Sequence, residues 1–449
     1  MTTTDSTAKP RLEYDLTRLQ ALIGEFKLTD FWKEMQNTVE DSPWHREANV
    51  AFHTEMTLVA AAKHFPKPTL VEYDSEREQL LKRFEMECVD TFSPGNIERL
   101  NAASGERRVA EEHNWFNRRH IVLVSLALLF HDTGKPAAEV TKISDERGEY
   151  RSYAGHEAES ARRFEGYVID NWAMFEGLIT IWDVYVITWM IEHHLPYGLK
   201  NKDKVLALDK SLVMTFLPNG PEVFFNMLKG DTEGRDSDDY AGNCGRMMDW
   251  IAERQSTLEN MGATVFHLNE QINNKQDTPE MIMMIGPSGA GKSSLRAALP
   301  GFVPFSLDDL RYKFALGHVD VMKGISPECN RFNYHSAYEY AVANEKEFDA
   351  YVTEAINAVF KDNKHILVDN TNLGAKRRKR YIDMARQRGM RVTALYIPAS
   401  LQQLLDRQHS RPDKQVPDGS VKSQFYSVAV PSFGGEFDSV NIAPHNFGV

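Results

Sequence analysis

The chain has 449 residues, of which 42% are hydrophobic and 26% are charged. These proportions match soluble globular proteins and exclude a largely disordered or fibrous chain, and the length predicts two or three domains. The 52 Lys and Arg residues against 64 Asp and Glu residues give a net charge of -12. This excludes non-specific coating of nucleic acid, so any contact with it requires a local basic patch.

Signals for secretion and membrane insertion are weak. The longest apolar run, residues 121–130, is about half of what a membrane-spanning helix needs. The first ten residues lack the charged and then apolar pattern of a signal peptide. Cys88, Cys244 and Cys329 are far apart and lack CxxC spacing, which argues against a disulfide framework or a cysteine-based zinc site. We therefore expect a cytoplasmic protein with no membrane partner.

The pattern of apolar residues predicts two domains of different class. Apolar residues recur three and four apart over residues 13–262, which predicts an all-α domain, and convincing alternating strands are missing there. The polar stretch 263–279, which ends in Pro279, predicts a linker. Over residues 280–449 short apolar runs alternate with helical stretches, which predicts an α/β domain with a parallel sheet.

The predicted helical domain carries a set of His and Asp residues that suits divalent cations. His131 and Asp132 are adjacent at the end of the apolar run, where the Asp can bridge two ions. The spacing of His45, Asn49 and His53 predicts that they share one face of a helix. The later candidates in chain order are His156, His193, His194 and Asp231. A single histidine is usually a structural residue, but the ordered set indicates a metal site.

This ordered set, with the H-D-x-G-K sequence that ends at Lys135, resembles the HD phosphohydrolase superfamily. That all-α family uses one or more divalent metals to hydrolyse phosphate esters. The resemblance implies that Lys135 pairs with the scissile phosphate and that the metals activate water. Histidine ligands favour a transition ion such as Mn²⁺ over Mg²⁺. The implied ligands are His53, His131, Asp132 and Asp231 at the core, with His156 and one of His193 and His194 at a second ion.

Residues 286–293 (GPSGAGKS) match the phosphate-binding pattern G-x-x-x-x-G-K-[ST]. Small residues let backbone N–H groups approach nucleotide phosphates, while Lys292 neutralises charge and the Ser293 hydroxyl can hold Mg²⁺. An apolar strand is expected before this loop and a helix after it, so the helix N-terminus adds to the anion site. The expected ligands are ATP or another NTP with Mg²⁺. The predicted binding residues are Gly286, Ser288, Gly289, Ala290, Gly291, Lys292, Ser293 and Ser294.

Three further motifs favour phosphoryl transfer. Asp308 and Arg311 follow the expected second strand and share a helix face, so the carboxylate can deprotonate an acceptor hydroxyl and the arginine can bind a substrate phosphate. Residues 366–372 (ILVDNTN) end a strand in polar side chains, and we expect the Thr and the last Asn to meet the acceptor. Arg407 and Arg411 are one helical turn apart, as in a lid that stabilises charge on the transferring group.

The order of these motifs, followed by Val416-Pro417, resembles the phage-type polynucleotide 5′-kinases over residues 280–449. The resemblance implies that Asp308 is the general base, that Arg311 holds the acceptor 3′-phosphate and that Arg411 contacts the donor phosphates. The chain departs from the family at Asn370, where the family has Asp.

Basic residues concentrate in one stretch of the predicted α/β domain. Eleven Lys and Arg residues and three acidic residues lie between Lys376 and Lys414. The run 376–380 alone is as typical of a solvated helix face as of a binding surface. Its place just after the acceptor-side strand favours a track for a polyanionic acceptor.

An HD phosphohydrolase followed by such a kinase resembles the bifunctional RNA end-healing enzymes. The expected partners are nucleic-acid ends with a 5′-OH and a 2′,3′-phosphate, and an RNA ligase partner is left open. One alternative is a nucleoside or small-molecule kinase fused to an HD nucleotidase. A second is a working kinase with a degenerate HD module. The third is a non-enzymatic ATP switch, which leaves Asp308 and the two lid arginines without a role.

Overall fold

The computed structural model describes residues 12, 14–42, 45–66, 109–144, 148–199, 201–216, 219–273, 278–317, 334–361, 364–411 and 415–448. Cys88, Cys329 and Lys414 lie outside these residues. The chain divides into two compact units, Met1–Phe164 with Asn171–Asn273 and Glu165–Asp170 with Asn274–Val449.

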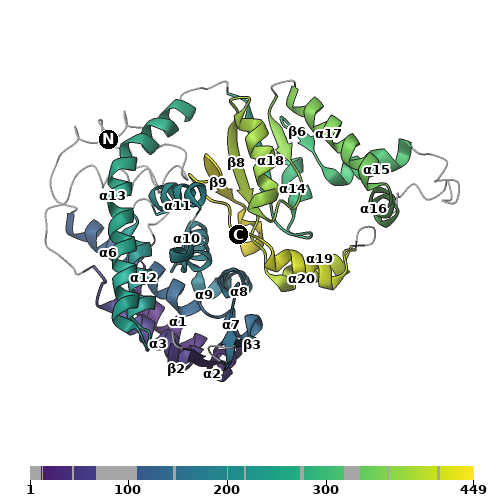
Figure 1. The fold of residues 1–449 in the computed structure, drawn as a ribbon. Coiled ribbons are helices and arrows are strands. Elements are labelled where there is room, and N and C mark those ends of the chain that lie inside the picture. The colour runs from purple at the N-terminus through teal and green to yellow at the C-terminus, as the bar shows by residue number, and fades with distance from the viewer. Residues whose placement is uncertain are drawn as a thin grey trace, which may run out of the picture. The chain divides into compact units, whose positions relative to one another are not determined.

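The N-terminal unit is mainly helical (Figure 1). Helices α6 and α10 contact each other at its centre, and α6 also contacts α3 and α12. Because α10 is apolar around almost its whole circumference, it must be buried. The segment Trp115–Ala138 is long and apolar enough to cross a membrane, but 78% of its most apolar window is buried inside the protein, as in a core helix. The described helices are α1 Leu16–Phe26, α2 Asp30–Asn37, α3 Val50–Ala62, α6 Val109–Phe130, α7 Lys135–Ala138, α8 His156–Asp170, α9 Trp172–Phe175, α10 Ile181–Glu192, η1 Pro196–Gly198, α11 Lys202–Thr215, α12 Glu222–Glu233 and α13 Tyr240–Asn273.

A buried polar network joins three parts of this unit. Asp183, in the first turn of α10, accepts hydrogen bonds from Arg119 of α6 at 2.9 Å and from the Tyr14 hydroxyl at 2.8 Å. Asp183 also completes a capping box with Thr180 at the start of α10. Because all three buried side chains find partners, the network fixes how these segments pack instead of destabilising the core.

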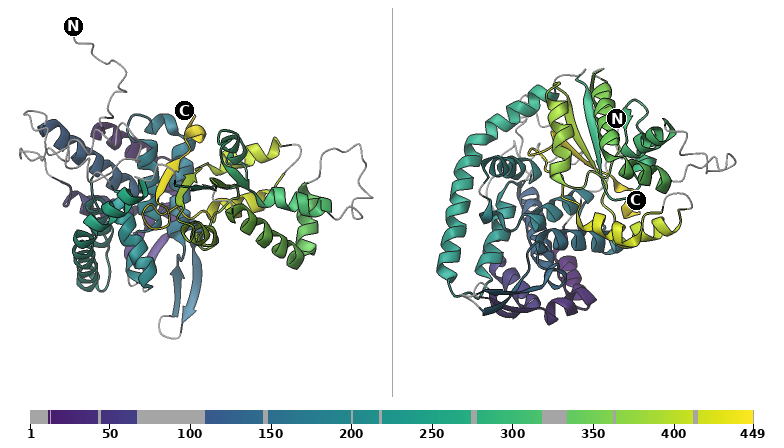
Figure 2. Two further views of the ribbon diagram at one scale, coloured as in Figure 1. Left: turned by 90° about the horizontal axis from the view of Figure 1, so that it is seen from above. Right: turned by 45° about the vertical axis from the view of Figure 1, so that its right-hand side comes forward.

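Two antiparallel hairpins correct the prediction of an all-α unit. They are β1 Val39–Ser42 with β2 His45–Asn49, and β3 Val140–Ser144 with β4 Gly148–Ser152. Figure 2 shows the blue β3–β4 hairpin extending away from the helices of its unit. The helical face predicted for residues 45–53 is therefore wrong in its first half. Asn49 ends the strand and caps α3 by accepting from the backbone N–H of Phe52.

The predicted linker is also shorter than expected. Helix α13 continues to Asn273, so residues 263–273 of the predicted linker 263–279 are helical. Polar composition misled the prediction, because it does not by itself prevent a helix.

The C-terminal unit is built on a five-stranded sheet, which confirms the predicted parallel α/β class. All strand pairs are parallel, in the order β6-β7-β5-β8-β9, so the strand that precedes the phosphate loop lies in the middle. Figure 1 shows helices on both sides of this sheet. The elements are β5 Glu280–Ile285, α14 Lys292–Ala297, β6 Val303–Phe305, α15 Leu307–Gly317, α16 Tyr334–Ala343, α17 Glu345–Lys361, β7 Ile366–Val368, α18 Ala375–Arg386, β8 Arg391–Tyr396, α19 Leu401–His409, α20 Asp418–Tyr426, β9 Ser439–Ile442 and η3 Pro444–Phe447.

The strand sequences are short apolar runs because helices cover both faces of the sheet. In one buried cluster, Met284 of β5 and Leu367 of β7 pack with Leu404 of α19 and with Val421 and Phe425 of α20. Parallel strands buried on both faces are typically continuous apolar runs. This packing holds the carboxyl ends of β5, β6 and β7 together, and these ends carry the motifs of the predicted kinase site.

Candidate functional site

The phosphate loop and the other kinase motifs line one cavity of about 370 Å³, here called the phosphate site. It brings together most of the residues that the sequence predicts for this chemistry. The predicted residues in its lining are Ser288, Gly289, Gly291, Lys292, Ser293, Asp308, Arg311, Asp369, Thr371 and Arg411. Gly286, Ala290, Ser294 and Arg407 do not line it.

The loop requires glycine at two of its positions. Gly289 and Gly291 have φ angles of +95° and +104°, a conformation that other residues rarely adopt. A Cβ at Gly291 would also come within 2.4 Å of the His445 ring. The Lys292 ammonium donates to the carbonyls of Gly286 and Pro287 at 2.8 and 2.7 Å, which holds it beneath the loop.

Two carboxylate–arginine pairs order the acceptor side of the phosphate site. Asp308 and Arg311 are 2.8 Å apart on the first turns of α15, and Asp308 is about two-fifths exposed. The Ser306 hydroxyl accepts from the backbone N–H of Asp309. Ser306, and not Asp308, therefore caps the start of α15. Arg296 of α14 bridges Asp309 at 2.9 Å and Asp369 at 3.3 Å.

The two lid arginines differ in position. Arg411 lines the phosphate site. Arg407 donates to the Gly289 carbonyl at 3.2 Å and to Asn446 Oδ1 at 2.8 Å, so it supports the phosphate loop from behind. Burial, together with the charge of Arg411, lowers the pKa of Arg407. The expected direct role of Arg407 at the nucleotide is therefore corrected to a supporting one.

Two further expectations on the acceptor side are wrong. Asn372 is buried, and its side chain donates to the Met284 carbonyl at 2.8 Å, so it joins β5 to the loop after β7 and does not face an acceptor. Arg378 lies inside the predicted basic track but is fully buried, and it pairs with Glu436 at 2.7 Å. Asn370, the position that departs from the kinase family, accepts from the backbone N–H of Leu307, and its Nδ2 has no hydrogen-bond partner among the described residues.

Several residues that line the phosphate site were not singled out from the sequence, among them Arg296, Tyr338, Arg377 and Gln424. Arg377 was counted only as part of a basic run, and Gln424 and Tyr338 carried no motif. Gln424 Oε1 accepts from the backbone N–H of Ser288 at 2.9 Å, which ties α20 to the loop. Arg377 was predictable in part, because it lies in the first turn of the helix that follows the polar end of β7.

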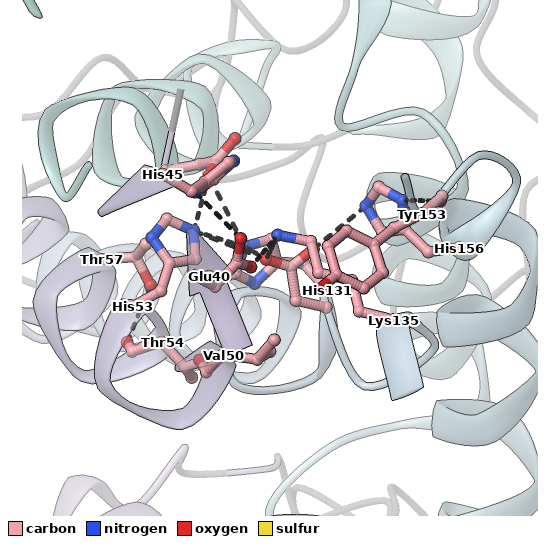
Figure 3. Close-up of polar contacts among 12 residues, drawn as sticks. Glu40, His45, Val50, His53, Thr54, Thr57, His131, Lys135, Tyr153 and His156 are labelled. Carbon is pink, nitrogen blue, oxygen red and sulfur yellow. Dashed lines mark hydrogen bonds and ion pairs between the residues drawn. The ribbon is translucent and has the colours of Figure 1, made fainter. Parts of the chain in front are cut away.

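In the N-terminal unit, five helical segments bring most of the predicted metal ligands together. In each of three groups among the described residues, the donor atoms lie within 4.8 Å of one another; one is His45, Glu47 and His53, and the other two consist of predicted ligands alone. The first donor group is His53, His131 and Asp231; the second donor group is Asp132, His156 and His194. All six residues are buried. Figure 3 shows the side chains of His53, Glu40, His131, Lys135 and His156 one after another across the site.

Asp132 joins the two groups through its two oxygens. Its Oδ2 lies 3.1 Å from His131 Nε2 and 3.5 Å from His53 Nε2. Its Oδ1 lies 3.0 Å from His156 Nε2 and 3.9 Å from His194 Nε2. One carboxylate thus faces a donor group on either side, which is the geometry of a bridging ligand between two cations.

Each of the four histidines is held through its Nδ1, so its Nε2 is presented to the cluster. The partners are the Leu128 carbonyl for His131 at 2.7 Å, the Tyr153 carbonyl for His156 at 2.8 Å, the Ile191 carbonyl for His194 at 2.7 Å and Glu47 for His53 at 3.0 Å. A hydrogen bond at Nδ1 orients each ring so that its Nε2 faces the cluster. Imidazole nitrogens and carboxylates of this number and arrangement fit two divalent transition ions.

His193 is not part of either donor group. Its ring stacks on Trp189 with the centroids 4.2 Å apart, and its Nδ1 lies 2.9 Å from the Trp189 carbonyl. Its neighbour His194 follows the end of α10 and reaches the second donor group. Between the two candidates left open by the sequence, the structure therefore selects His194.

The electrostatics of the two donor groups differ. Burial opposes the charge on His131, but the carboxylates of Asp132 and Asp231 outweigh it and raise its pKa to about 10. Burial and the nearby His156 and His131 lower the pKa of His194 to about 3. Burial also disfavours the charge on Asp132, yet His131 and Lys135 hold its pKa well below its usual value. The carboxylate is therefore available as a ligand near neutral pH.

A cavity of about 310 Å³ opens onto the second donor group. It is lined by Lys135, which lies 2.8 Å from Asp132 and also pairs with Glu40. Arg235, which follows the end of α12, pairs with Asp231 of that helix and lines the same cavity. The positively charged side chains of Lys135 and Arg235 beside the donor groups suit a phosphate ester.

Sequence reasoning missed Arg235, Glu40 and Glu47 in this site. Arg235 was not singled out, because the predicted helix ends near Asp231, and in the structure too Arg235 lies beyond the end of α12. Glu40 and Glu47 were not detectable, because they reach the site from a hairpin whose strands have no apolar alternation.

Comparison with known proteins adds to the geometry of the C-terminal unit. A family model described as "AAA domain" matches residues 281–431. A stretch of 147 residues is 24% identical to a protein of Autographa californica nuclear polyhedrosis virus named "Putative bifunctional polynucleotide kinase/RNA ligase". The match covers 32% of this chain and 20% of the viral protein. The C-terminal unit is a P-loop kinase-type domain.

Proposed function

We propose that the chain heals nucleic-acid ends, with RNA the favoured substrate. Its C-terminal unit transfers phosphate from ATP to a 5′-OH, and its N-terminal unit is an HD-type phosphohydrolase that removes a 2′,3′-cyclic, 2′- or 3′-phosphate. The observation that carries this proposal is the presence in one chain of a cavity lined by the phosphate loop and of two clustered His and Asp donor groups, both of which suit phosphate chemistry. The name of the viral relative supports a polynucleotide as the kinase acceptor.

In the proposed kinase reaction, the phosphate loop holds the donor nucleotide and Asp308 accepts the proton of the 5′-OH. Arg311, 2.8 Å from Asp308, positions this carboxylate and binds an acceptor phosphate. Arg411 stabilises negative charge on the transferring group. The Nδ2 of Asn370, which has no hydrogen-bond partner among the described residues, can donate a hydrogen bond to an oxygen of the substrate. The Asp that the kinase family has at this position could only accept one.

In the proposed hydrolase reaction, the two donor groups would hold divalent cations, and such cations would supply activated water and polarisation of the ester. Lys135 and Arg235 bind the phosphate oxygens from the cavity side. Asp132 keeps the two groups at a fixed spacing, and the buried surroundings exclude other water. The reaction releases phosphate, or opens a cyclic phosphate before its removal.

The test is one oligonucleotide that carries both ends. An RNA with a 5′-OH and a 2′,3′-cyclic phosphate is incubated with the protein, ATP and either Mg²⁺ or Mn²⁺. Mass spectrometry of the RNA reports the change at each end. We expect a 5′-phosphate and a 3′-OH product, and we expect chelators to stop the hydrolysis.

Two results would contradict the proposal. Phosphorylation of free nucleosides but not of the RNA would favour a small-molecule kinase with an HD nucleotidase. If the RNA is phosphorylated but its cyclic phosphate stays intact with both Mg²⁺ and Mn²⁺, only the kinase part of the proposal stands.

A further inference from the structure

The cavity of about 310 Å³ at the second donor group has a wall that the proposed hydrolysis does not use. Tyr150, Ser152 and Tyr153 line this wall, from strand β4 and the residue that follows it. The proposed phosphate contacts, Lys135 and Arg235, come from other segments of the cavity lining. Because ligand pockets have volumes of roughly 300–1,000 Å³, this cavity suits a single nucleotide and not a longer stretch of chain.

One face of the β3–β4 hairpin belongs to this wall. The strand register pairs Lys142 with Tyr150 and Val140 with Ser152, and directly paired residues have their side chains on the same face. This face is here called the cavity face, because Tyr150 and Ser152 line the cavity. Its described side chains are Val140, Lys142, Tyr150 and Ser152, so it carries one cation and no acid.

The acidic residues of this region lie away from the cavity face. Glu149 is on the opposite face of the hairpin, because successive side chains of a strand alternate between faces. The two glutamates of the cavity lining are close to the donor groups, since Glu40 pairs with Lys135 and Glu157 lies 3.7 Å from His156 Nδ1. The cavity face is therefore the side of the cavity that can attract a polyanion.

The two tyrosines of the wall differ in their partners. The Tyr153 hydroxyl donates to the Val39 carbonyl at 2.6 Å, and the Lys135 ammonium lies 5.7 Å from its ring centre, so Tyr153 is fixed beside a proposed phosphate contact. Tyr150 is half-buried, and its side chain has no hydrogen bond or ring contact with another residue that the structure describes. An aromatic ring of this kind at a cavity wall is a surface on which a protein can stack an unpaired base.

Lys142 continues the cavity face outward. It is exposed, it lies opposite Tyr150, and the hairpin extends away from the helices of its unit (Figure 2). Directly paired residues have Cβ atoms about 4.5–5.5 Å apart, so the long Lys142 side chain can reach the phosphate on the 5′ side of a nucleotide that stacks on Tyr150. The base and both phosphates of one terminal nucleotide thus each have a contact.

We propose that the cavity face of the β3–β4 hairpin binds the 3′-terminal nucleotide of the RNA, with Tyr150 stacked on its base and Lys142 at the phosphate on its 5′ side. The inference rests on the proposed hydrolase function. The stacked base places the 2′,3′-phosphate of the same nucleotide at Lys135 and Arg235. The hairpin thereby makes the hydrolase prefer unpaired RNA ends over simple phosphate esters.

Two RNAs that end in a 2′,3′-cyclic phosphate test the stacking. One is intact, and the other has 1-deoxyribose, which lacks a base but keeps the 2′- and 3′-oxygens, in place of its last nucleoside. KM and kcat of hydrolysis in Mn²⁺ are measured for the wild type, Tyr150→Ala, Tyr150→Phe and Ile143→Ala. Ile143→Ala is the matched control, because Ile143 is 80% exposed on the opposite face of the same hairpin.

Loss of one stacked base weakens binding by roughly 5- to 150-fold. We expect the base-free RNA to raise the KM of the wild type by such a factor, with a smaller change in kcat. Tyr150→Ala should raise the KM for the intact RNA similarly and should no longer distinguish the two RNAs. Tyr150→Phe and Ile143→Ala should behave like the wild type.

A mononucleotide tests the contact of Lys142. A nucleoside 2′,3′-cyclic phosphate has no phosphate on its 5′ side, so Lys142→Ala should leave its KM unchanged. On the intact RNA the same variant should raise KM and should lower the slope of log KM against log salt concentration by about one, which is the contribution of one phosphate contact. Equal effects of Lys142→Ala on the mononucleotide and the RNA would overturn this contact.

Equal kinetics of the wild type on the two RNAs would overturn the inference and leave the hydrolase function standing. So would penalties of Tyr150→Ala and of base removal that simply multiply. A wild type that hydrolyses neither the RNAs nor the mononucleotide would overturn the hydrolase function and the inference together. If Tyr150→Ala fails to fold, Tyr150→Leu takes its place, because it keeps an apolar side chain in the strand without an aromatic ring.

Discussion

Asp308 is the residue on which the proposed kinase chemistry depends most directly. A 5′-hydroxyl has a pKa far above neutrality, so its proton must leave as the bond to phosphorus forms. We expect Asp308→Asn to lower kcat on a 5′-OH oligonucleotide by on the order of 10²-fold or more, with little change in the KM for ATP. Asn keeps the shape of the side chain and its hydrogen bond with Arg311 but cannot accept the proton.

The neighbouring carboxylate provides the control. Asp309 lies in the first turn of α15 beside Asp308 and pairs with Arg296. Asp309→Asn therefore removes a charge at the phosphate site but keeps the proposed base. If Asp308→Asn retains near-wild-type kcat, or if both variants lose the same activity, Asp308 is not the general base.

His120 provides a prediction on stability. It is buried on α6 and bonded to Asn226 at 2.8 Å, and burial together with the charge of Arg119 lowers its pKa to about 4. Between pH 6.5 and pH 4 the unfolded chain binds a proton at this site that the folded chain does not, so stability falls as the pH falls. From pH 7 to pH 5 this amounts to about 2 kcal/mol.

We expect His120→Gln, which keeps a hydrogen-bond partner for Asn226, to remove that part of the acid destabilisation. All seven tryptophans lie in the first 250 residues, so tryptophan fluorescence during urea unfolding reports on the N-terminal unit. Free energies of unfolding are compared at pH 7 and pH 5. Parallel losses in the wild type and the variant would show that His120 does not contribute.

At the scale of elements, the β1–β2 hairpin supports the donor groups. Glu47 of β2 is buried 3.0 Å from His53 Nδ1 and also accepts from the backbone N–H of Asp236 at 3.0 Å. A carboxylate behind a ligating histidine typically contributes 10–100-fold to metal affinity. We expect Glu47→Ala to weaken Mn²⁺ binding by about that factor and Glu47→Gln to restore most of it, since its amide oxygen can accept the same bond.

Mn²⁺ affinity is measured by competition with a chelator, independently of hydrolysis. Glu55→Ala is the matched control, because Glu55 pairs with Lys27 at the surface of the same unit. Unchanged affinity in Glu47→Ala would contradict the role of the hairpin.

The elements also show which parts of the structure are predictable from the sequence. The phosphate loop and the parallel strands were predictable, because a Gly-rich loop and buried apolar runs depend on local sequence. The β1–β2 hairpin was not, because His45–Asn49 contains no β-branched residue and no alternation of apolar and polar residues. Val140–Ser144 is rich in β-branched residues, which favour a strand, so β3 could have been predicted from the sequence.

Within the candidate sites, long-range packing decided what local pattern could not. His193 and His194 are equivalent in sequence, and only the packing of Trp189 against His193 separates them. Arg378 and Arg377 are equally basic neighbours, yet Glu436, far along the chain, binds Arg378 in the interior. Sequence therefore identified the kinds of residue at each site better than the individual members.

At the scale of the whole molecule, the two proposed activities have their residues in different compact units. We expect Lys292→Ala to abolish 5′-phosphate transfer, because it removes the cation of the phosphate loop, and to spare removal of the 2′,3′-phosphate. His131→Ala should do the reverse, because it removes a ligand of the first donor group. Both activities are measured on the RNA that carries both ends.

Circular dichroism and urea unfolding of both variants serve as the control for folding. A folded variant that loses both activities would contradict two independent sites. So would a His131→Ala protein that retains full hydrolysis.

The strand order of the sheet has a consequence for synthesis of the chain. The phosphate loop follows β5, but β5 pairs with β7 and β8 rather than with β6, the next strand made. Its second partner ends at Tyr396, more than a hundred residues after Ile285. At the usual rate of translation that interval is roughly 5–20 seconds. Until β7 has been made, β5 has neither of its partner strands, and the sheet on the other side of β5 waits for β8. We therefore expect the phosphate loop to reach its folded form late in synthesis, because pairing between distant strands is slow.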